Sequence, residues 1–353
     1  MKIAQISSLW FRVPPVRYGG AEMSTHLLTE GLVKKGHEVI LFASGDSLTE
    51  AKLISPYPIH FEKTHFDYAS EQSMVYLNIH NLIKANNEGR FDVINFHLSL
   101  WSDYVYFLVA KQLNTKCVFT VRYTIPDKKK LPLEYQMLSN YKNLNFVSIS
   151  KSQQRSNLKL NWIANIYNSV DQKIYTYNGN KGDYFLWVGS IHPYKGLHLA
   201  IGAAKQTKSK LVIAGKINKS IPIAYDYWLK EIYPRIDGKQ IIFKGETTRK
   251  QTAHLMSHAV AFLNPIQWDE PFGLVMVESM ACGVPVIVFD RGSAQEIVKN
   301  KKTGFIVKNC EEMMTAMKNV TSIKRYDCFK HVSDKFNINT MIDNYEKLYS
   351  SLR

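Results

Sequence analysis

Short apolar runs alternate with longer amphipathic segments along the whole chain, and this alternation is the feature that most restricts the possible folds. Apolar runs separated by helix-length segments are typical of parallel sheets wrapped by helices. In the first half, the predicted strands are Lys2–Ser7, Glu38–Ala43, Val93–Phe96, Cys117–Val121 and Asn145–Ile149. In the second half, they are Tyr184–Val188, Lys210–Ala214, Gln240–Lys244, Ala259–Asn264, Pro285–Phe289 and Gly304–Val307. The predicted helices between them include Ala21–Lys35, Gly196–Lys205, Thr248–His258 and Phe272–Cys282.

The two halves repeat this scheme, so the sequence predicts an α/β protein of two domains. A chain of 353 residues is also longer than a single hydrophobic core usually supports. The short polar stretch Tyr167–Asp171 is the expected boundary, which gives domains of residues 1–170 and 171–336. The amphipathic segment 337–353 is expected to close the N-terminal domain as a helix. Because open α/β sheets bind ligands at the carboxyl ends of their strands, we expect the two domains to face one another across a cleft.

Composition excludes several classes of protein. Hydrophobic residues make up 45% and charged residues 21%, which is a globular composition. No run of about 18 apolar residues occurs, so no membrane span is expected. The segment Met1–Ser8 lacks the apolar core of a secretory signal and is predicted as a strand in a cytoplasmic protein. The four cysteines have no C-x-x-C spacing, which indicates reduced thiols rather than a zinc site or disulfides.

The formal net charge of +15 is the most unusual feature of the composition. A large positive field favours polyanionic partners such as nucleic acid, anionic lipid or phosphorylated small molecules. No basic motif interleaved with aromatic residues is present, so nucleic acid is not the expected partner. Lys111, Lys116 and Lys128–Lys130 cluster in the first half and predict peripheral association with the inner face of the membrane. A lysine-rich genome is the alternative explanation.

The segment from Glu270 to Val286 is the most informative stretch for chemistry. Pro271 stands where a helix is expected to start, since proline suits the first helical position. Backbone N–H groups of Phe272, Gly273 and Leu274 would then point out of the helix and bind a diphosphate. Glu278 lies in an otherwise apolar helix, where a carboxylate needs a partner, and ribose hydroxyls would serve. The alternative is a solvent-facing glutamate.

Glu270 and Glu278 are separated by seven residues, with P-F-G-L after the first and A-C-G-V-P-V at the end of the helix. This pattern resembles the E-x7-E motif of family 4 retaining glycosyltransferases, and the resemblance extends over essentially the whole chain. It implies the GT-B architecture of two Rossmann-like domains, with the acceptor on the N-terminal domain and a UDP- or GDP-linked sugar donor on the C-terminal one. It also implies that Glu270 holds the sugar hydroxyls and that neither a metal nor a cofactor is required.

Two further loops match the family in part. Gly19 and Gly20, between the first strand and the first helix, resemble the glycine-rich loop that reaches the donor diphosphate. The stretch Gly189–Gly196 resembles G-R-x-x-x-x-K-G, whose arginine and lysine neutralise the leaving diphosphate. Lys195 matches the lysine, but Ser190 replaces the arginine. The candidates for compensation, each of which is alternatively a surface charge, are Lys216, Lys244 and Arg17.

A second departure concerns the residue that contacts the transferred sugar. The family commonly has T-x-H at the end of a strand of the N-terminal domain, whereas this chain has Arg122 in place of the histidine. His97 follows another predicted strand and also points to the cleft by its strand-end position. Arg122 and His97 are therefore both candidate catalytic residues, with a structural histidine as the alternative for His97.

The expected function is that of a retaining glycosyltransferase that moves a sugar from a nucleoside diphosphate donor to a glycan, lipid-linked or small-molecule acceptor. Two alternatives remain: another GT-B enzyme, such as a sugar-nucleotide epimerase, and a non-catalytic nucleotide-binding protein. The E-x7-E pair argues against the first. A nicotinamide dehydrogenase is not expected, because Ser8–Gly20 lacks the G-x-G-x-x-G pattern.

Overall fold

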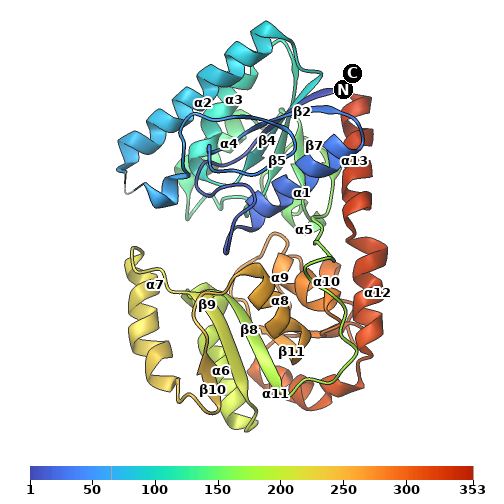
Figure 1. The fold of residues 1–353 in the computed structure, drawn as a ribbon. Helices are drawn as coiled ribbons and strands as arrows, with labels where there is room; N and C mark the ends of the chain where they lie inside the picture. The colour runs from blue at the N-terminus through green and yellow to red at the C-terminus, as the bar shows by residue number, and fades with distance from the viewer. Residues whose placement is uncertain (65, 353) are drawn as a thin grey trace. The chain divides into compact units, whose positions relative to one another are not determined.

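The computed structural model describes residues 1–64 and 66–352. The chain divides into two compact units, one of Met1–Asn168 with Ile338–Arg353 and the other of Ser169–Asn337 (Figure 1). We call them the N unit and the C unit. The division falls inside the stretch Tyr167–Asp171 that the sequence marks as polar. Each unit contains one parallel sheet with helices on both faces, so the predicted α/β class with two sheets is confirmed.

The sheet of the N unit has seven strands in the order β3-β2-β1-β4-β5-β6-β7. Their bounds are β1 Lys2–Ile6, β2 Glu38–Phe42, β3 Lys52–Ile54, β4 Val93–Leu98, β5 Lys116–Val121, β6 Phe146–Ser148 and β7 Trp162–Asn165. The sequence reading missed β3 and β7. Both are short edge strands without a fully buried residue, so they lack the continuous apolar run that marks the central strands.

Helices cover both faces of this sheet, and alternate strand residues point to opposite faces. The helices of the N unit are α1 Gly20–Lys34, α2 Tyr68–Glu88, α3 Val105–Ala110, α4 Pro132–Asn140, α5 Lys151–Gln154 and α13 Ile338–Ser351. One core contains residues of α2, α3 and α4, and the other contains residues of α1 and α13. Ile342 of α13 packs onto Gly31 of α1, where a Cβ atom would lie 2.0 Å from the Ile342 Cδ1 atom.

The sheet of the C unit has six strands in the order β10-β9-β8-β11-β12-β13. Their bounds are β8 Tyr184–Ser190, β9 Leu211–Lys216, β10 Ile241–Phe243, β11 Ala259–Asn264, β12 Val286–Phe289 and β13 Gly304–Val307. All six overlap the predicted strands. The helices are α6 Leu197–Gln206, α7 Pro222–Tyr227, α8 Arg249–Ser257, α9 Leu274–Ala281, α10 Ala294–Ile297, α11 Cys310–Asn319 and α12 Arg325–Lys335.

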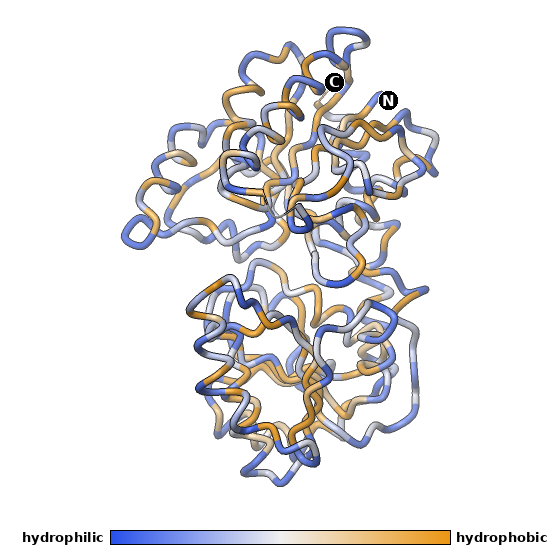
Figure 2. The backbone as a smooth tube through the Cα atoms, turned by 60° about the vertical axis from the view of Figure 1, so that its left-hand side comes forward, coloured by the Kyte–Doolittle hydropathy of each residue, from blue (hydrophilic) through white to orange (hydrophobic). Residues whose placement is uncertain are grey.

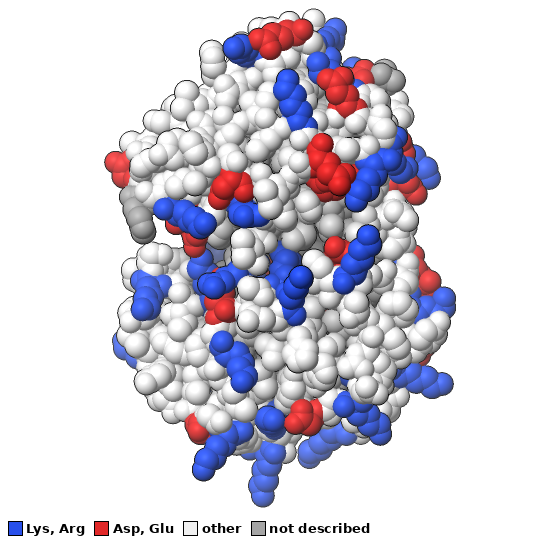
Figure 3. Space-filling view, in the orientation of Figure 1, with Lys and Arg blue, Asp and Glu red and all other residues white. Residues whose placement is uncertain are grey.

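Apolar residues gather along the strands of both units, whereas the connecting loops are mostly hydrophilic (Figure 2). No helix in the described part of the chain is long and apolar enough to cross a membrane. On the face shown in Figure 3, lysine and arginine side chains are scattered among acidic ones on both units. The basic excess therefore does not form a single patch on this face.

Candidate active site

Two predicted site residues meet at the carboxyl edge of the C-unit sheet. Lys195 follows strand β8, and Glu270 follows the neighbouring strand β11. The Nζ atom of Lys195 lies 2.6 Å from the Oε2 atom of Glu270. Their side chains are only 18% and 16% exposed, respectively, so this ion pair is largely shielded from water. An ion pair in such surroundings is stronger than one at the surface, where water screens both charges.

Aromatic rings enclose the ammonium group of Lys195. It lies 5.1 Å from the ring centre of Trp268 and 5.7 Å from that of Tyr194. Cations at these distances are attracted to the ring face. The backbone N–H of Gln267 donates to the carbonyl of Tyr194 at 2.7 Å, which ties the β8 loop to the β11 loop. The side chain of Lys195 is therefore held in place by two loops.

The start of helix α9 differs from the prediction. Pro271 is not the first helical residue, because the helix begins at Leu274 and Gly273 caps it with a φ of 77°. Phe272 explains the shift: its side chain is buried, and its carbonyl accepts a hydrogen bond from Ser293 Oγ at 2.7 Å. The chain therefore enters the helix only after Gly273. Of the three predicted diphosphate-binding N–H groups, that of Leu274 lies in the first turn, and those of Phe272 and Gly273 precede it.

Glu278 is buried in α9 and is only 7% exposed, so the alternative of a solvent-facing glutamate is wrong. Its Oε1 atom lies 3.3 Å from Nη1 of Arg249, the first residue of α8. Burial raises the pKa of Glu278, and the charge of Arg249 and a hydrogen bond from Tyr175 counteract the rise. The sequence reading missed Arg249 and Tyr175, because only the packing of the C unit brings them to α9.

Ser190 stands where the family has arginine, and its hydroxyl lies 3.3 Å from Nδ2 of Asn218. Lys216 pairs in register with Ser190 at the ends of β9 and β8. Side chains in register on neighbouring strands project from the same face of a sheet. Of the three candidates to replace the missing arginine charge, Lys216 is therefore the one that lies beside Ser190. Lys244 follows β10, and Arg17 is an exposed residue of the N unit.

In the N unit, the glycine-rich loop leads directly into helix α1. Gly19 caps the helix with a φ of 135°, and Gly20 is its first residue. A Cβ atom on Gly19 would lie 2.8 Å from Pro15 and 3.0 Å from Oε2 of Glu22, so only glycine fits. Glu22 is itself buried in the first turn of α1. Sequence analysis did not select Glu22 as a site residue, although a carboxylate beside a glycine-rich turn could have indicated one.

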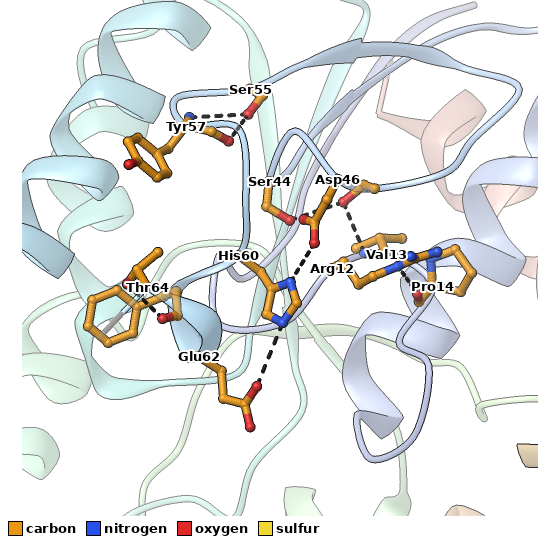
Figure 4. A network of polar contacts seen from close by, with 12 residues as sticks. Arg12, Val13, Pro14, Ser44, Asp46, Ser55, Tyr57, His60, Glu62 and Thr64 are labelled. Atoms are coloured by element: carbon orange, nitrogen blue, oxygen red, sulfur yellow. Dashed lines mark hydrogen bonds and ion pairs between the residues drawn. The ribbon is translucent and has the colours of Figure 1, made fainter. Parts of the chain in front are cut away.

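A polar cluster around His60 supports the chain that leads to this loop (Figure 4). The Nδ1 atom of His60 lies 2.7 Å from Asp46 Oδ2, and its Nε2 atom lies 3.7 Å from Glu62 Oε2. The backbone N–H of Val13 donates to Ser47 Oγ at 3.0 Å. The Val13–Ser47 contact anchors the segment that precedes Gly19, and the backbone N–H groups of Phe61 and Glu62, next to His60, donate to carbonyls of the same segment at 2.9 and 3.1 Å.

His97 and Arg122 also meet. Nδ1 of His97 lies 2.8 Å from Nη2 and 3.2 Å from Nε of Arg122, and Nε2 of His97 lies 2.6 Å from Oε1 of Gln5. An amide oxygen only accepts, so the proton resides on Nε2, and Nδ1 accepts from the guanidinium. Burial, reinforced by the charge of Arg122, holds the pKa of His97 well below its ordinary value. Nη1 of Arg122 donates to Asn168 at 2.8 Å.

The C-terminal helix completes this network from the other end of the chain. The hydroxyl of Tyr349 lies 2.7 Å from Nδ2 of Asn95 and 3.3 Å from Nε2 of Gln5. The hydroxyl of Tyr345 lies 3.2 Å from that of Thr120. Helix α13 thus contributes polar groups to the interior of the N unit, in addition to its apolar face.

Within residues 1–64 and 66–352, no group of three or more His, Cys, Asp or Glu side chains is placed to hold a metal ion. The expectation that no metal is required stays a prediction.

Two family comparisons divide the chain as the two units do. Residues 175–326 match the family described as glycosyl transferases group 1, and residues 18–174 match glycosyltransferase family 4. Together the matches cover every strand of the two sheets except β1. Each unit thus matches a glycosyltransferase family, and the chain is a glycosyltransferase.

Curated relatives of this glycosyltransferase extend along most of its length. It is 23% identical to the O-antigen chain mannosyltransferase C of Escherichia coli, with 96% of each chain covered. It is 24% identical to an uncharacterised glycosyltransferase of Methanocaldococcus jannaschii, with 87% of this chain and 85% of the relative covered.

Solved structures show that the glycosyltransferase has the GT-B fold. Sucrose-phosphate synthase from Thermosynechococcus elongatus matches with a TM-score of 0.83 and 18% identity, covering 99% of this chain and 98% of that one. Anabaena HepE, solved in complex with UDP-glucose, matches with a TM-score of 0.75 and 15% identity, covering 99% and 100%.

Proposed function

We propose that the C unit binds a UDP- or GDP-linked sugar and that the sugar is transferred with retention of its anomeric configuration. The main observation that supports this proposal is the Lys195–Glu270 ion pair at the carboxyl edge of the sheet. The HepE complex with UDP-glucose and the name of the Escherichia coli mannosyltransferase support a nucleotide-sugar donor. Retention rests on the resemblance of Glu270 and Glu278 to the E-x7-E motif.

The paired residues have complementary tasks in such a transfer. The bond between the anomeric carbon and the diphosphate breaks, and the nucleoside diphosphate leaves with the bonding electrons. The ammonium of Lys195 stabilises the negative charge that develops on the leaving oxygen. The sugar ring gains positive charge at the same time, and the carboxylate of Glu270 stabilises it while holding sugar hydroxyls. The acceptor hydroxyl forms the new bond to the anomeric carbon, and its proton passes to the departing diphosphate oxygen.

We assign the acceptor to the N unit and infer that it is a glycan or a lipid-linked sugar. The similarity to the O-antigen chain mannosyltransferase C of Escherichia coli supports this class. Arg122 is the proposed sugar-binding residue of this unit, whereas His97 is buried with both ring nitrogens engaged and positions the guanidinium, which favours the alternative of a structural histidine. Their mutual hydrogen bonds orient the guanidinium, whose remaining N–H groups stay available for sugar oxygens.

Product analysis with a panel of UDP- and GDP-sugars tests the proposal. A glycosylated acceptor with the anomeric configuration of the donor, measured by NMR, is the expected result. An isomerised sugar nucleotide without transfer would favour the epimerase. Binding of neither UDP nor GDP in calorimetry would overturn the assignment of the donor site.

We also propose that the N unit docks on anionic membranes through helices α3 and α4. Leu133 is 73% exposed and Leu108 is 51% exposed, and Met137 lies one turn beyond Leu133. Lys128–Lys130 directly precede α4, and Lys111 caps α3 with its ammonium 4.8 Å from the Tyr141 ring at the end of α4. Exposed apolar side chains next to lysines suit the boundary between headgroups and acyl chains.

Co-sedimentation with vesicles that contain phosphatidylserine tests this docking. We expect binding at low salt. Leu133→Ser should weaken it several-fold, and replacement of Lys128–Lys130 by alanine should weaken it by about two orders of magnitude, since each lysine near the surface contributes about 1 kcal/mol. The matched control replaces three exposed lysines of the C unit, Lys299, Lys301 and Lys302, and removes the same charge. Equal losses in both triple variants would leave net charge as the explanation.

A further inference from the structure

Two buried nitrogen atoms close to Lys195 have no hydrogen-bond partner among the described residues. They are Nε1 of Trp268, in the loop after β11, and Nδ1 of His192, in the loop after β8. An indole Nε1 is always a donor, whereas an imidazole Nδ1 donates or accepts according to its tautomer. Buried polar atoms without partners are rare in native proteins, and each costs stability unless a ligand or water satisfies it.

The same aromatic cluster contains both atoms. The rings of His192 and Tyr194 lie 3.9 Å apart, and those of Tyr194 and Trp268 lie 5.2 Å apart. Lys195 packs against the second pair, with its ammonium above both rings. The two nitrogen atoms are therefore fixed by ring packing at the Lys195–Glu270 ion pair.

The charge state of this cluster favours a ligand rich in oxygen. Glu270 neutralises Lys195 in the resting structure, so the ion pair by itself offers no net charge to a dianionic diphosphate. Burial and the charge of Lys195 lower the pKa of His192, which keeps the imidazole neutral at neutral pH. A fixed indole N–H and a fixed imidazole nitrogen beside a neutral pair would bind diphosphate or sugar hydroxyl oxygens without the need to desolvate a further charge.

We propose that Trp268 and His192 are donor-binding residues whose ring nitrogens hydrogen-bond to oxygen atoms of the nucleotide sugar. This inference rests on the proposed function and adds two contacts that the motif residues do not supply. The ligand oxygen belongs either to the diphosphate or to a hydroxyl of the transferred sugar. Trp268 has a second role, since its ring also holds Lys195.

Calorimetric titration of Trp268→Phe and His192→Phe separates these possibilities. Both variants keep an aromatic ring and remove the nitrogen. We expect a fivefold to thirtyfold weaker Kd, which corresponds to one lost hydrogen bond of about 1–2 kcal/mol. A loss with UDP or GDP alone would assign the contact to the diphosphate, whereas a loss only with the sugar-linked form would assign it to the sugar.

Trp228→Phe is the matched control, because Trp228 packs against Phe243 and Tyr233 in the same unit. Its affinity should equal that of the wild type. If Trp268→Phe does not fold, as judged from its melting curve, His192→Phe carries the test alone. Wild-type binding with unchanged affinity in folded variants would overturn this inference and leave the proposed function intact. Absence of nucleotide binding in the wild type would overturn both.

Discussion

Lys195 and Glu270 form an ion pair with a separation of 2.6 Å between Nζ and Oε2. They come from the loops after two adjacent strands, β8 and β11, although 75 positions separate them in the chain. Each residue holds the other in place. In the proposed donor complex, a diphosphate would compete with Glu270 for the ammonium, and the carboxylate would be released towards the sugar.

The first prediction concerns Lys195. We expect Lys195→Ala to lower kcat by about one to three orders of magnitude, because leaving-group stabilisation of about 1.5–4 kcal/mol is lost. Steady-state kinetics with the cognate donor measures this effect. Lys205→Ala, at an exposed position of α6, is the control and should keep full activity. Turnover within twofold of the wild type would remove Lys195 from the mechanism.

The second prediction is that substitutions of the two glutamates have different effects on kcat and on nucleotide affinity. Glu270→Gln should lower kcat and leave the affinity for free nucleoside diphosphate nearly unchanged, because its interactions strengthen in the transition state. Glu278→Gln should mainly weaken nucleotide binding, by about 1.5–3 kcal/mol for hydrogen bonds to a charged group. Calorimetry beside kinetics measures both. The opposite pattern would exchange the two roles.

Arg249 adds a control to that experiment. Glu278 is buried against Arg249, so Glu278→Gln should also lower the melting temperature, whereas Glu270→Gln should not lower it to the same extent. If Arg249→Gln destabilises the protein and leaves nucleotide affinity intact, the stability and binding roles of Glu278 are separable.

The third prediction concerns the C-terminal helix. Tyr349→Phe removes a hydroxyl that contacts Asn95 and Gln5 in the buried network, and it should destabilise the protein by about 1–3 kcal/mol, the cost of unsatisfied buried polar groups. Chemical denaturation measures the free energy of unfolding. Tyr326→Phe is the control, since this tyrosine is exposed on α12 and its substitution should have almost no effect.

The fourth prediction concerns acid sensitivity. The unfolded chain carries His97 with an ordinary pKa near 6.5, whereas the native state holds the pKa well below that value. As pH falls below about 6.5, the unfolded state therefore binds the proton first and the free energy of unfolding decreases. His97→Gln should reduce this slope by up to about 1.4 kcal/mol per pH unit. Equal slopes in both proteins from pH 6.5 to 5 would contradict the neutral, buried state of His97.

The fifth prediction compares two glycines. Gly273→Ala should destabilise the C unit by more than about 1 kcal/mol, because the residue has a φ of 77° and a Cβ atom would lie 2.5 Å from Met276 Cε. Gly202→Ala in helix α6 meets nothing within 4 Å and should stabilise the protein by about 0.4–1 kcal/mol. Thermal unfolding of both variants checks the opposite signs.

The central strands were predictable, because buried parallel strands need continuous apolar runs that stand out in the sequence. The four central strands of the C unit and the five central strands of the N unit follow this rule. The edge strands β10 and β13 of the C unit were also predicted, because their own residues are mostly apolar. The edge strands β3 and β7 were missed, since an edge strand is solvated on one side and needs no such run. The start of α9 was predicted too early, because the burial of Phe272 overrode the local preference of Pro271 for a first helical turn.

For the site, the residues at the strand ends could be predicted from local sequence alone: a lysine after β8, a carboxylate after β11 and glycines at two helix starts. These are local requirements, set by backbone geometry and by the chemistry of a diphosphate. Which of these residues contact one another depends on the packing of the folded chain. The tertiary structure paired Lys195 with Glu270, placed Arg249 on Glu278, and joined α13 to His97 through Gln5, because packing brings together groups that no spacing along the chain relates.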